Sequence, residues 1–111
     1  MNKDIRDRYE SRARIMKALA HPTRMFIVDE LNHKDRCVQE LTQMIGADTS
    51  TVSKHLSILK EAGIVDYEKY GTQIYYHLAA PCVMDFFSCL ENMLHTNIQR
   101  QTSGMQDFRK G

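Results

Sequence analysis

The sequence has no long hydrophobic run. Nowhere in its 111 residues does an apolar stretch approach the roughly 18 to 20 residues that a membrane-spanning helix needs. Residues 1–5 begin a charged segment and contain no apolar core of a signal peptide. We therefore predict a cytoplasmic protein without a membrane partner.

Cysteine is scarce, and the three residues present are an odd number. Without a secretion signal, this count argues against a disulfide scaffold and for reduced thiols. Cys-x-x-Cys pairs, internal repeats and low-complexity tracts are absent from the sequence. The length fits one domain at residues 1–101, followed by a polar tail at residues 102–111 that we predict to be flexible.

One stretch has the pattern of a helix with an unusual outer face. Val52, Leu56 and Leu59 recur at helical spacing, with Asp48 at the N-cap position and Gly63 beyond the C-terminus. The opposite face carries short polar side chains instead of the Glu and Lys that a solvated helix usually shows. Such donors and acceptors suit contacts with base edges and phosphates, so this is a candidate recognition helix.

A shorter helix is predicted just before it. In residues 37–46, Val38, Leu41 and Ile45 share one face, and Gly46 ends the pattern. About two residues then lead into the recognition helix. A helix, a tight turn with glycine and a helix with a polar outer face make the helix-turn-helix pattern.

Two β-rich segments follow the recognition helix, at residues 64–70 and 72–78, and Gly71 separates them. This pattern is typical of a β-hairpin, which after a recognition helix forms a wing. We therefore predict a fold that is mainly α with a β-hairpin wing, a winged helix-turn-helix. Its expected order is four helices, two strands and a last helix.

Four short motifs resemble the arsenic-repressor (ArsR/SmtB) family of bacterial and archaeal sensors. They are Ala-His-Pro-Thr-Arg at residues 20–24, Cys-Val-Gln-Glu-Leu at 37–41, Thr-Val-Ser-Lys-His-Leu at 51–56 and Tyr-Tyr-His-Leu at 75–78. The resemblance covers roughly residues 12–95, with the motifs in the family's order. It implies a homodimeric transcriptional repressor that binds double-stranded operator DNA. His21 belongs to the helix-entry motif, where we expect a structural role.

We predict that the recognition helix enters the major groove and that the wing tip lies near the minor groove. The candidate DNA contacts are Thr49, Ser50, Thr51, Ser53, Lys54, His55 and Ser57 in the helix, and Lys69, Tyr70 and Gln73 in the wing. His55 lies near the edge of the outer face. It therefore either reaches phosphate or packs at the edge of the helix.

The net charge of the predicted DNA-binding part is unfavourable for binding to DNA phosphates. Residues 37–80 contain three Lys against five Asp/Glu, whereas residues 1–36 contain nine Lys/Arg against six Asp/Glu. DNA-binding domains usually carry a basic surface. Attraction to phosphate must therefore come from Lys54, Lys69, the N-terminus of the recognition helix and the basic first helix. We expect moderate affinity per protomer and a need for dimerisation.

The first and last helices are the predicted dimer interface. The helix at residues 4–19 is amphipathic, and the family resemblance assigns it to the interface. A last helix is expected at residues 81–101, with Pro81 at its N1 position, and it has more apolar surface than one small core needs. The predicted interface residues are Tyr9, Met16, Phe86, Leu90, Met93 and Leu94.

The three cysteines are candidates for a soft-metal site. Cys37 and Cys82 are expected in the first turns of their helices, where the helix dipole stabilises a thiolate. Cys89 follows Cys82 by two turns, so their Cα atoms lie roughly 10 Å apart in a continuous helix. One site therefore needs either a helix that begins after Cys82, or Cys37 as a ligand. Each cysteine could instead be a small buried hydrophobe.

The cysteine motifs limit which inducers the protein could bind. Gln39 replaces the second cysteine that related metal sites carry, and residues 1–36 contain no cysteine. The last-helix zinc site of other family members lacks its histidine and glutamate here. Thiolates select soft ions, and trivalent arsenic favours three sulfurs whereas zinc favours four ligands. With no cofactor permanently bound, the resemblance and the cysteine count favour As(III), Sb(III) or another soft thiophilic ion at Cys37, Cys82 and Cys89.

Other functions remain open. A redox- or persulfide-sensing repressor needs only a pair of cysteines. A thiol enzyme would use Cys37 or Cys82 as its nucleophile, but no phosphate loop or carboxylate pair accompanies them. A winged-helix module that binds protein is favoured by the acidic balance of residues 37–80, and opposed by Ser50, Ser53 and Lys54.

Overall fold

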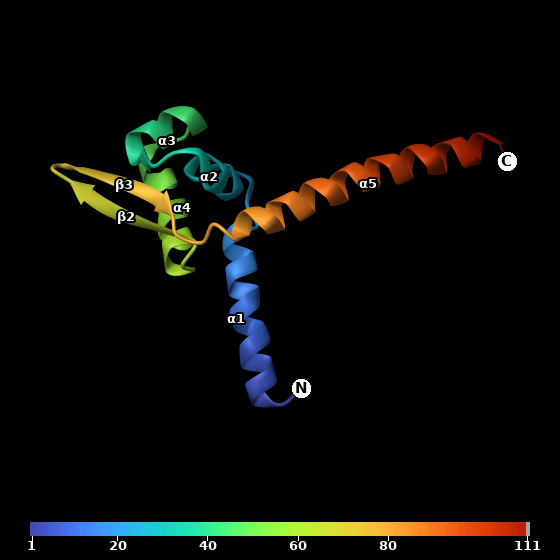
Figure 1. Cartoon of the computed structure of the whole chain (residues 1–111), viewed down its shortest axis with the longest axis horizontal. Coiled ribbons are helices and arrows are strands. Elements are labelled where there is room, and N and C mark those ends of the chain that lie inside the picture. Colours follow the sequence, from blue (N-terminus) through green and yellow to red (C-terminus); the bar gives the residue numbers. More distant parts are fainter. Residues whose placement is uncertain (111) are drawn as a thin grey trace. The chain divides into compact units, whose positions relative to one another are not determined.

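The computed structural model describes the backbone of residues 1–110 and the side chains of residues 1–100. It divides into two compact units, Met1–Pro81 and Cys82–Gly111. In chain order the elements are α1 (Lys3–Leu19), α2 (Pro22–His33), β1 (Arg36–Cys37), α3 (Val38–Ile45), α4 (Thr49–Glu61), β2 (Val65–Tyr70), β3 (Gln73–Leu78) and α5 (Val83–Lys110) (Figure 1). None of the described helices is both long and apolar enough to span a membrane.

Side-chain caps fix where the helices of the first unit begin. The His21 imidazole caps α2, because its Nδ1 accepts a hydrogen bond of 3.1 Å from the Thr23 amide. Pro22 follows at the first helical position, as the sequence predicted. Asp48 caps α4 in the same way, with its Oδ1 2.7 Å from the Thr51 amide. The predicted structural role of His21 is therefore confirmed.

Glycine ends the two helices of the helix-turn-helix. Gly46, at the C-cap of α3, has a φ of 78°, and Gly63, just after α4, has a φ of 79°. Residues with a Cβ rarely adopt this left-handed conformation, so glycine is suited to both positions. The tight turn between α3 and α4 is therefore encoded locally, as predicted.

The sheet has one more strand than the sequence predicted. Besides the hairpin of β2 and β3, the short strand β1 pairs antiparallel with β3, giving the order β1-β3-β2. Arg36 lies opposite Tyr76, and Cys37 lies opposite Tyr75. The predicted winged helix-turn-helix and its order of helices and hairpin are confirmed, and β1 is an additional strand. A strand of two residues is too short to show an alternating pattern.

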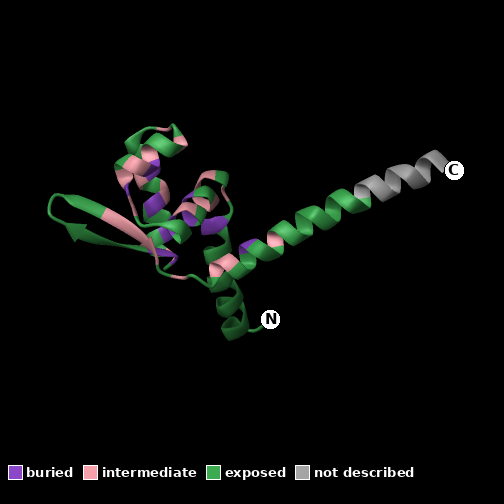
Figure 2. Cartoon of the chain, turned by 45° about the horizontal axis from the view of Figure 1, so that its top comes forward, coloured by how far each residue is buried: buried purple, intermediate pink, exposed green. Residues whose placement is uncertain are grey.

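The core of the first unit is built from α2, α3, α4 and the base of the wing (Figure 2). Its fully buried side chains are Ile27, Val28, Leu41, Val52, Leu56, Leu59, Ile64 and Val65. Each such side chain stabilises the fold by about 1.5–3 kcal/mol through burial. The predicted apolar stripe of α4 is confirmed, and its burial fixes which face of the helix points outward.

The second unit begins differently from the prediction. α5 starts at Val83, so Pro81 and Cys82 lie in the preceding turn rather than inside the helix. The Cys82 carbonyl accepts a hydrogen bond of 3.1 Å from the Asp85 amide. The helix continues to Lys110, beyond its predicted end at residue 101. The side chains of the predicted tail, residues 102–111, lie outside the described part, and its flexibility stays a prediction.

Candidate nucleic-acid interface

The N-terminus of α4 is organised by Asp48. Its Oδ1 accepts hydrogen bonds from the Thr51 amide and from the Ser50 hydroxyl, both at 2.7 Å. The Ser50 hydroxyl and then the Thr51 amide lower the pKa of Asp48 to about 2. The helix therefore begins with an ionised, hydrogen-bonded carboxylate. In this arrangement the Ser50 proton is donated to the cap, which leaves the Ser50 oxygen as an acceptor for another group.

Beyond this cap, the outer face of α4 is open to solvent. Thr49, Ser50, Thr51, Lys54 and Ser57 are exposed, and Ser53 is half-buried. The opposite face supplies Val52, Leu56 and Leu59 to the core. The helix therefore presents hydroxyls and one ammonium group outward from a rigid apolar base. Such groups can donate to and accept from base edges or phosphate oxygens.

His55 differs from the other predicted contacts of α4. It is half-buried, and its ring lies against the ring of His21 with the centroids 4.4 Å apart. Its Nδ1 lies 3.3 Å from Nη1 of Arg24. Of the two roles open from the sequence, the structure shows packing at the helix edge. A contact between His55 and phosphate stays a prediction.

The wing carries two chemically different faces. Residues directly opposite one another in an antiparallel pair share a face. Lys69 pairs with Ile74, and Tyr67 pairs with Tyr76, so these four side chains lie on one face. The ammonium group of Lys60 at the end of α4 lies over the Tyr67 ring at 5.2 Å, which identifies this as the face toward α4.

The other face of the wing is acidic and tyrosine-rich. It carries Glu68 opposite Tyr75, and Tyr70 opposite Gln73. The Tyr70 hydroxyl donates to Glu68 at 2.6 Å, and this bond raises the pKa of Tyr70. The Tyr75 hydroxyl donates to Gln73 at 2.9 Å. Tyr70 and Gln73 do flank the turn at the tip, as predicted, but they lie on the opposite face from Lys69.

The sequence and the fold are similar to those of known regulators. Residues 21–67 match the bacterial regulatory proteins of the arsR family. Over 104 residues, 93% of this chain and 91% of the relative, the chain is 31% identical to Rv0081, an uncharacterized HTH-type transcriptional regulator of Mycobacterium tuberculosis. The chain belongs to the ArsR family. The crystal structure of Rv0081 superposes with a TM-score of 0.77, covering 85% of this chain and 95% of that one at 30% identity.

Two further similarities extend the comparison for this ArsR-family chain. A biofilm growth-associated repressor of Xylella fastidiosa is 37% identical over 75 residues, which cover 68% of this chain and 66% of the relative. A homodimeric winged helix-turn-helix DNA-binding domain of Mycobacterium bovis has a TM-score of 0.77 at 27% identity, covering 90% and 93% of the two chains. The chain is therefore a transcriptional regulator of the ArsR family, which is a family of regulatory proteins.

The three cysteines of this ArsR-family chain are divided between the two units, with Cys37 in the first and Cys82 and Cys89 in the second. Cys37 is buried, at 5% exposure, whereas Cys82 and Cys89 are exposed. In the described part of the chain, no group of three His, Cys, Asp or Glu side chains could hold a metal ion. The predicted thiolate set of Cys37, Cys82 and Cys89 draws on both units and stays a prediction.

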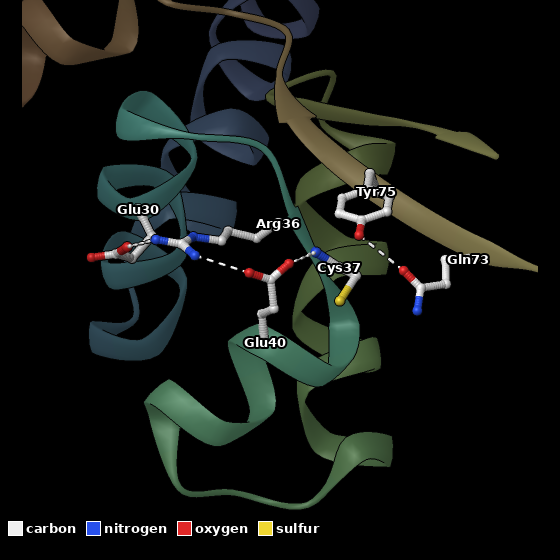
Figure 3. A network of polar contacts seen from close by, with 6 residues as sticks. All are labelled: Glu30, Arg36, Cys37, Glu40, Gln73 and Tyr75. Atoms are coloured by element: carbon white, nitrogen blue, oxygen red, sulfur yellow. Dashed lines mark hydrogen bonds and ion pairs between the residues drawn. The ribbon is translucent and has the colours of Figure 1, made fainter. Parts of the chain in front are cut away.

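Cys37 lies at the start of α3, within a network of polar contacts. It is the N-cap residue of that helix, and its amide donates to Glu40 Oε1 at 3.2 Å. The other oxygen of Glu40 lies 2.9 Å from Arg36 Nη1, and Arg36 also approaches Glu30 at 3.7 Å (Figure 3). The Arg36 and Cys37 hydrogen bonds lower the pKa of Glu40. This network ties the end of α2 to the start of α3.

The residues predicted for a dimer interface are largely open to solvent in the single chain. Tyr9 and Met16 on α1 are both 54% exposed, and Met93 and Leu94 on α5 are 54% and 57% exposed. Phe86 is also exposed, and Leu90 is half-buried. Each unit thus carries large apolar side chains that its own packing does not cover.

The sequence interpretation overlooked Arg24, which contacts α1 and α4 as well as belonging to α2. The helix-entry motif at residues 20–24 contains it, and that motif could have drawn attention to it. Its partners could not be read from the sequence, because His55 lies 31 residues away.

Proposed function

We propose that this chain represses transcription as a homodimer that binds operator DNA with the outer face of α4 and the tip of the wing. The observation that carries this proposal is the exposed row of hydroxyls and Lys54 on a helix whose other face is wholly buried. Membership of the ArsR family supports the same role. The acidic balance of residues 37–80 makes a second protomer necessary, because two half-sites double the number of phosphate contacts.

The uncovered apolar side chains of α1 and α5 support the homodimer. A monomer rarely leaves many large apolar side chains exposed on its helices unless another surface covers them. The homodimeric state of the similar Mycobacterium bovis domain agrees with this. In a two-fold dimer the same residues of both chains meet, so one set of side chains serves both protomers.

For the inducer, we propose a thiol-seeking species that acts first on the exposed Cys82 and Cys89. A soft ion such as As(III) or Sb(III) needs three sulfurs for its preferred geometry. Cys37 belongs to the first unit and Cys82 and Cys89 to the second, so such a site would have to join cysteines of both units or of both chains. An oxidant or persulfide needs only two thiols, and the exposure of two cysteines favours that alternative.

DNA binding is tested by selecting an operator from random duplexes with the wild-type protein and measuring its affinity at two salt concentrations. Specific binding that weakens steeply with salt is expected. A protein that selects no sequence and binds DNA no better than a neutral protein would contradict the proposed function.

The inducer is tested with Cys37→Ser, Cys82→Ser and Cys89→Ser, each measured for operator binding with arsenite and with a persulfide donor. Loss of the arsenite response in all three variants supports a three-sulfur site. Release by persulfide that survives Cys37→Ser but is lost in Cys82→Ser and Cys89→Ser supports the two-thiol switch. Normal responses in all three variants would exclude the cysteines as the sensor.

A further inference from the structure

Arg24 lies where α1, α2 and α4 meet. Its Nε donates to the Ala18 carbonyl at 2.6 Å, and its Nη2 donates to the Lys17 carbonyl at 3.3 Å. Both carbonyls belong to the last turn of α1, where a cation is favourable, and the Lys17 carbonyl also accepts from the Ala20 amide at 3.3 Å. The third contact, from Nη1, reaches His55 Nδ1 on α4 at 3.3 Å. One side chain thus joins the end of α1 to the recognition helix.

These contacts require neutral imidazoles. An arginine can only donate hydrogen bonds, so His55 Nδ1 must be the acceptor. His21 Nδ1 also accepts, because its partner is the Thr23 amide. Each ring therefore carries its proton on Nε2, and the two rings lie with their centroids 4.4 Å apart and their planes inclined at 49°.

The surroundings of His55 keep it neutral. Burial lowers the pKa of His55 below its ordinary 6.5, and the neighbouring His21 and Arg24 lower it further. The groups that face His55 are Arg24 from α2 and His21 from its N-cap, and Arg24 in turn bonds the Lys17 and Ala18 carbonyls of α1. Protonation of His55 would place a second cation against Arg24 and remove the acceptor.

We infer that Arg24 is a positioning residue for DNA recognition, which holds α4 against the end of α1 through a neutral His55. The inference rests on the proposed DNA-binding function and deepens it. Contacts with base edges require side chains to be held within about 0.5 Å, so the support of α4 affects sequence discrimination more than general attraction to DNA. Since α1 carries the proposed interface residues Tyr9 and Met16, a displacement of α1 is transmitted directly to the recognition helix.

The first test compares Arg24→Gln with Arg14→Gln. Arg14 lies on α1, is exposed and bonds the Ser11 hydroxyl at 3.1 Å, so its substitution removes the same charge without touching His55. Loss of a charge-assisted hydrogen bond predicts that Arg24→Gln weakens operator binding about tenfold. Binding to random-sequence DNA should fall equally in the two variants. Equal losses of operator affinity in both variants would overturn the inference.

The second test uses pH and a variant that cannot titrate. In a His21→Asn background, which keeps an N-cap acceptor, operator affinity should fall as the pH is lowered through the histidine range, from about pH 8 to about pH 5. Adding His55→Asn places an amide oxygen near the former Nδ1, and should keep the affinity while flattening the profile. Adding His55→Ala should lose operator affinity at every pH.

The opposite pH dependence would overturn the inference. If operator binding strengthens on acidification and His55→Asn abolishes this gain, then His55 contacts phosphate as an imidazolium. Far-ultraviolet circular dichroism checks the fold, and if Arg24→Gln does not fold, the histidine variants decide the matter. A wild-type protein that selects no operator would contradict the DNA-binding function itself, which separates the two failures.

Discussion

At the scale of single residues, the start of the recognition helix depends on one carboxylate. Asp48 accepts from the Ser50 hydroxyl and the Thr51 amide, and these bonds lower its pKa to about 2. The negative charge also lies at the positive end of the helix dipole, where it is favourable. Asp48 is exposed, so in the proposed complex with DNA its negative charge would repel a phosphate that approached the start of α4.

We predict that the stability of the protein depends on the ionisation of Asp48. Because its folded pKa lies below the ordinary value of 3.8, its stabilising contribution is complete above that value. The contribution is lost as the pH falls through about 2. Urea unfolding followed over this range should show a steeper loss of stability in the wild type than in Asp48→Asn, which retains a cap without a titrating group. Parallel pH profiles for the two proteins would contradict this role.

Residue identities predicted the cap but not every partner. Asp48 follows from local rules, because an N-cap bonds amides only two or three positions away. The predicted outer face also follows from helical spacing. The engagement of His55 with Arg24 does not, because it depends on the packing of α4 against α2, which sequence spacing cannot supply.

At the scale of elements, the two faces of the wing differ in charge, since one carries a lysine and the other a glutamate. Lys69 is the only Lys or Arg within β2 and β3, and it lies opposite Ile74 on the face toward α4. Glu68 and Tyr70 lie on the other face and are bonded to each other. DNA should therefore meet the wing through its tip and the face of Lys69.

We predict that Lys69→Ala weakens binding to all DNA sequences alike and reduces the dependence of affinity on salt. Loss of one phosphate contact should lower the slope of log affinity against log salt by about 1. Lys60→Ala is a matched control, since Lys60 is exposed but lies over the Tyr67 ring. Gel shifts over a range of salt concentrations measure both slopes. An unchanged slope for Lys69→Ala would place the wing away from the backbone.

Some elements could be predicted from sequence patterns and others could not. The hairpin was predictable, because alternation and Gly71 mark two strands and their turn. Strand β1 was not, since its two residues are defined by their pairing with Tyr75 and Tyr76. The start of α5 was predicted two residues too early, because a proline such as Pro81 is equally compatible with the first turn of a helix and the turn before it.

At the scale of the whole molecule, the exposed apolar residues of α1 and α5 point to assembly. We predict that Met93→Asp dissociates the homodimer without unfolding the chain, because Met93 is 54% exposed in the protomer. A charge buried at an interface without a partner costs several kcal/mol. Ser88→Asp adds the same charge at an exposed position of α5, away from the stripe of Phe86 and Leu90, and should leave the dimer intact.

Sedimentation velocity measures this effect, with circular dichroism to verify folding. An undisturbed dimer in Met93→Asp, or equal dissociation in Ser88→Asp, would contradict the proposed interface. The apolar excess of the last helix was visible in the sequence. The sequence did not show which residues a partner covers. An interface depends on the surfaces of two chains, and it produces no hydrophobic periodicity of its own in one sequence.

The recognition face of α4 is tested most directly by Ser53→Ala combined with Lys54→Ala. The measurement is the affinity of this double variant for the operator selected by the wild type, beside its affinity for random-sequence DNA. A good base contact contributes about 1–3 kcal/mol of discrimination, so operator affinity should fall by at least about tenfold more than affinity for random DNA. If the double variant binds the operator as tightly as the wild type does, α4 does not read the sequence.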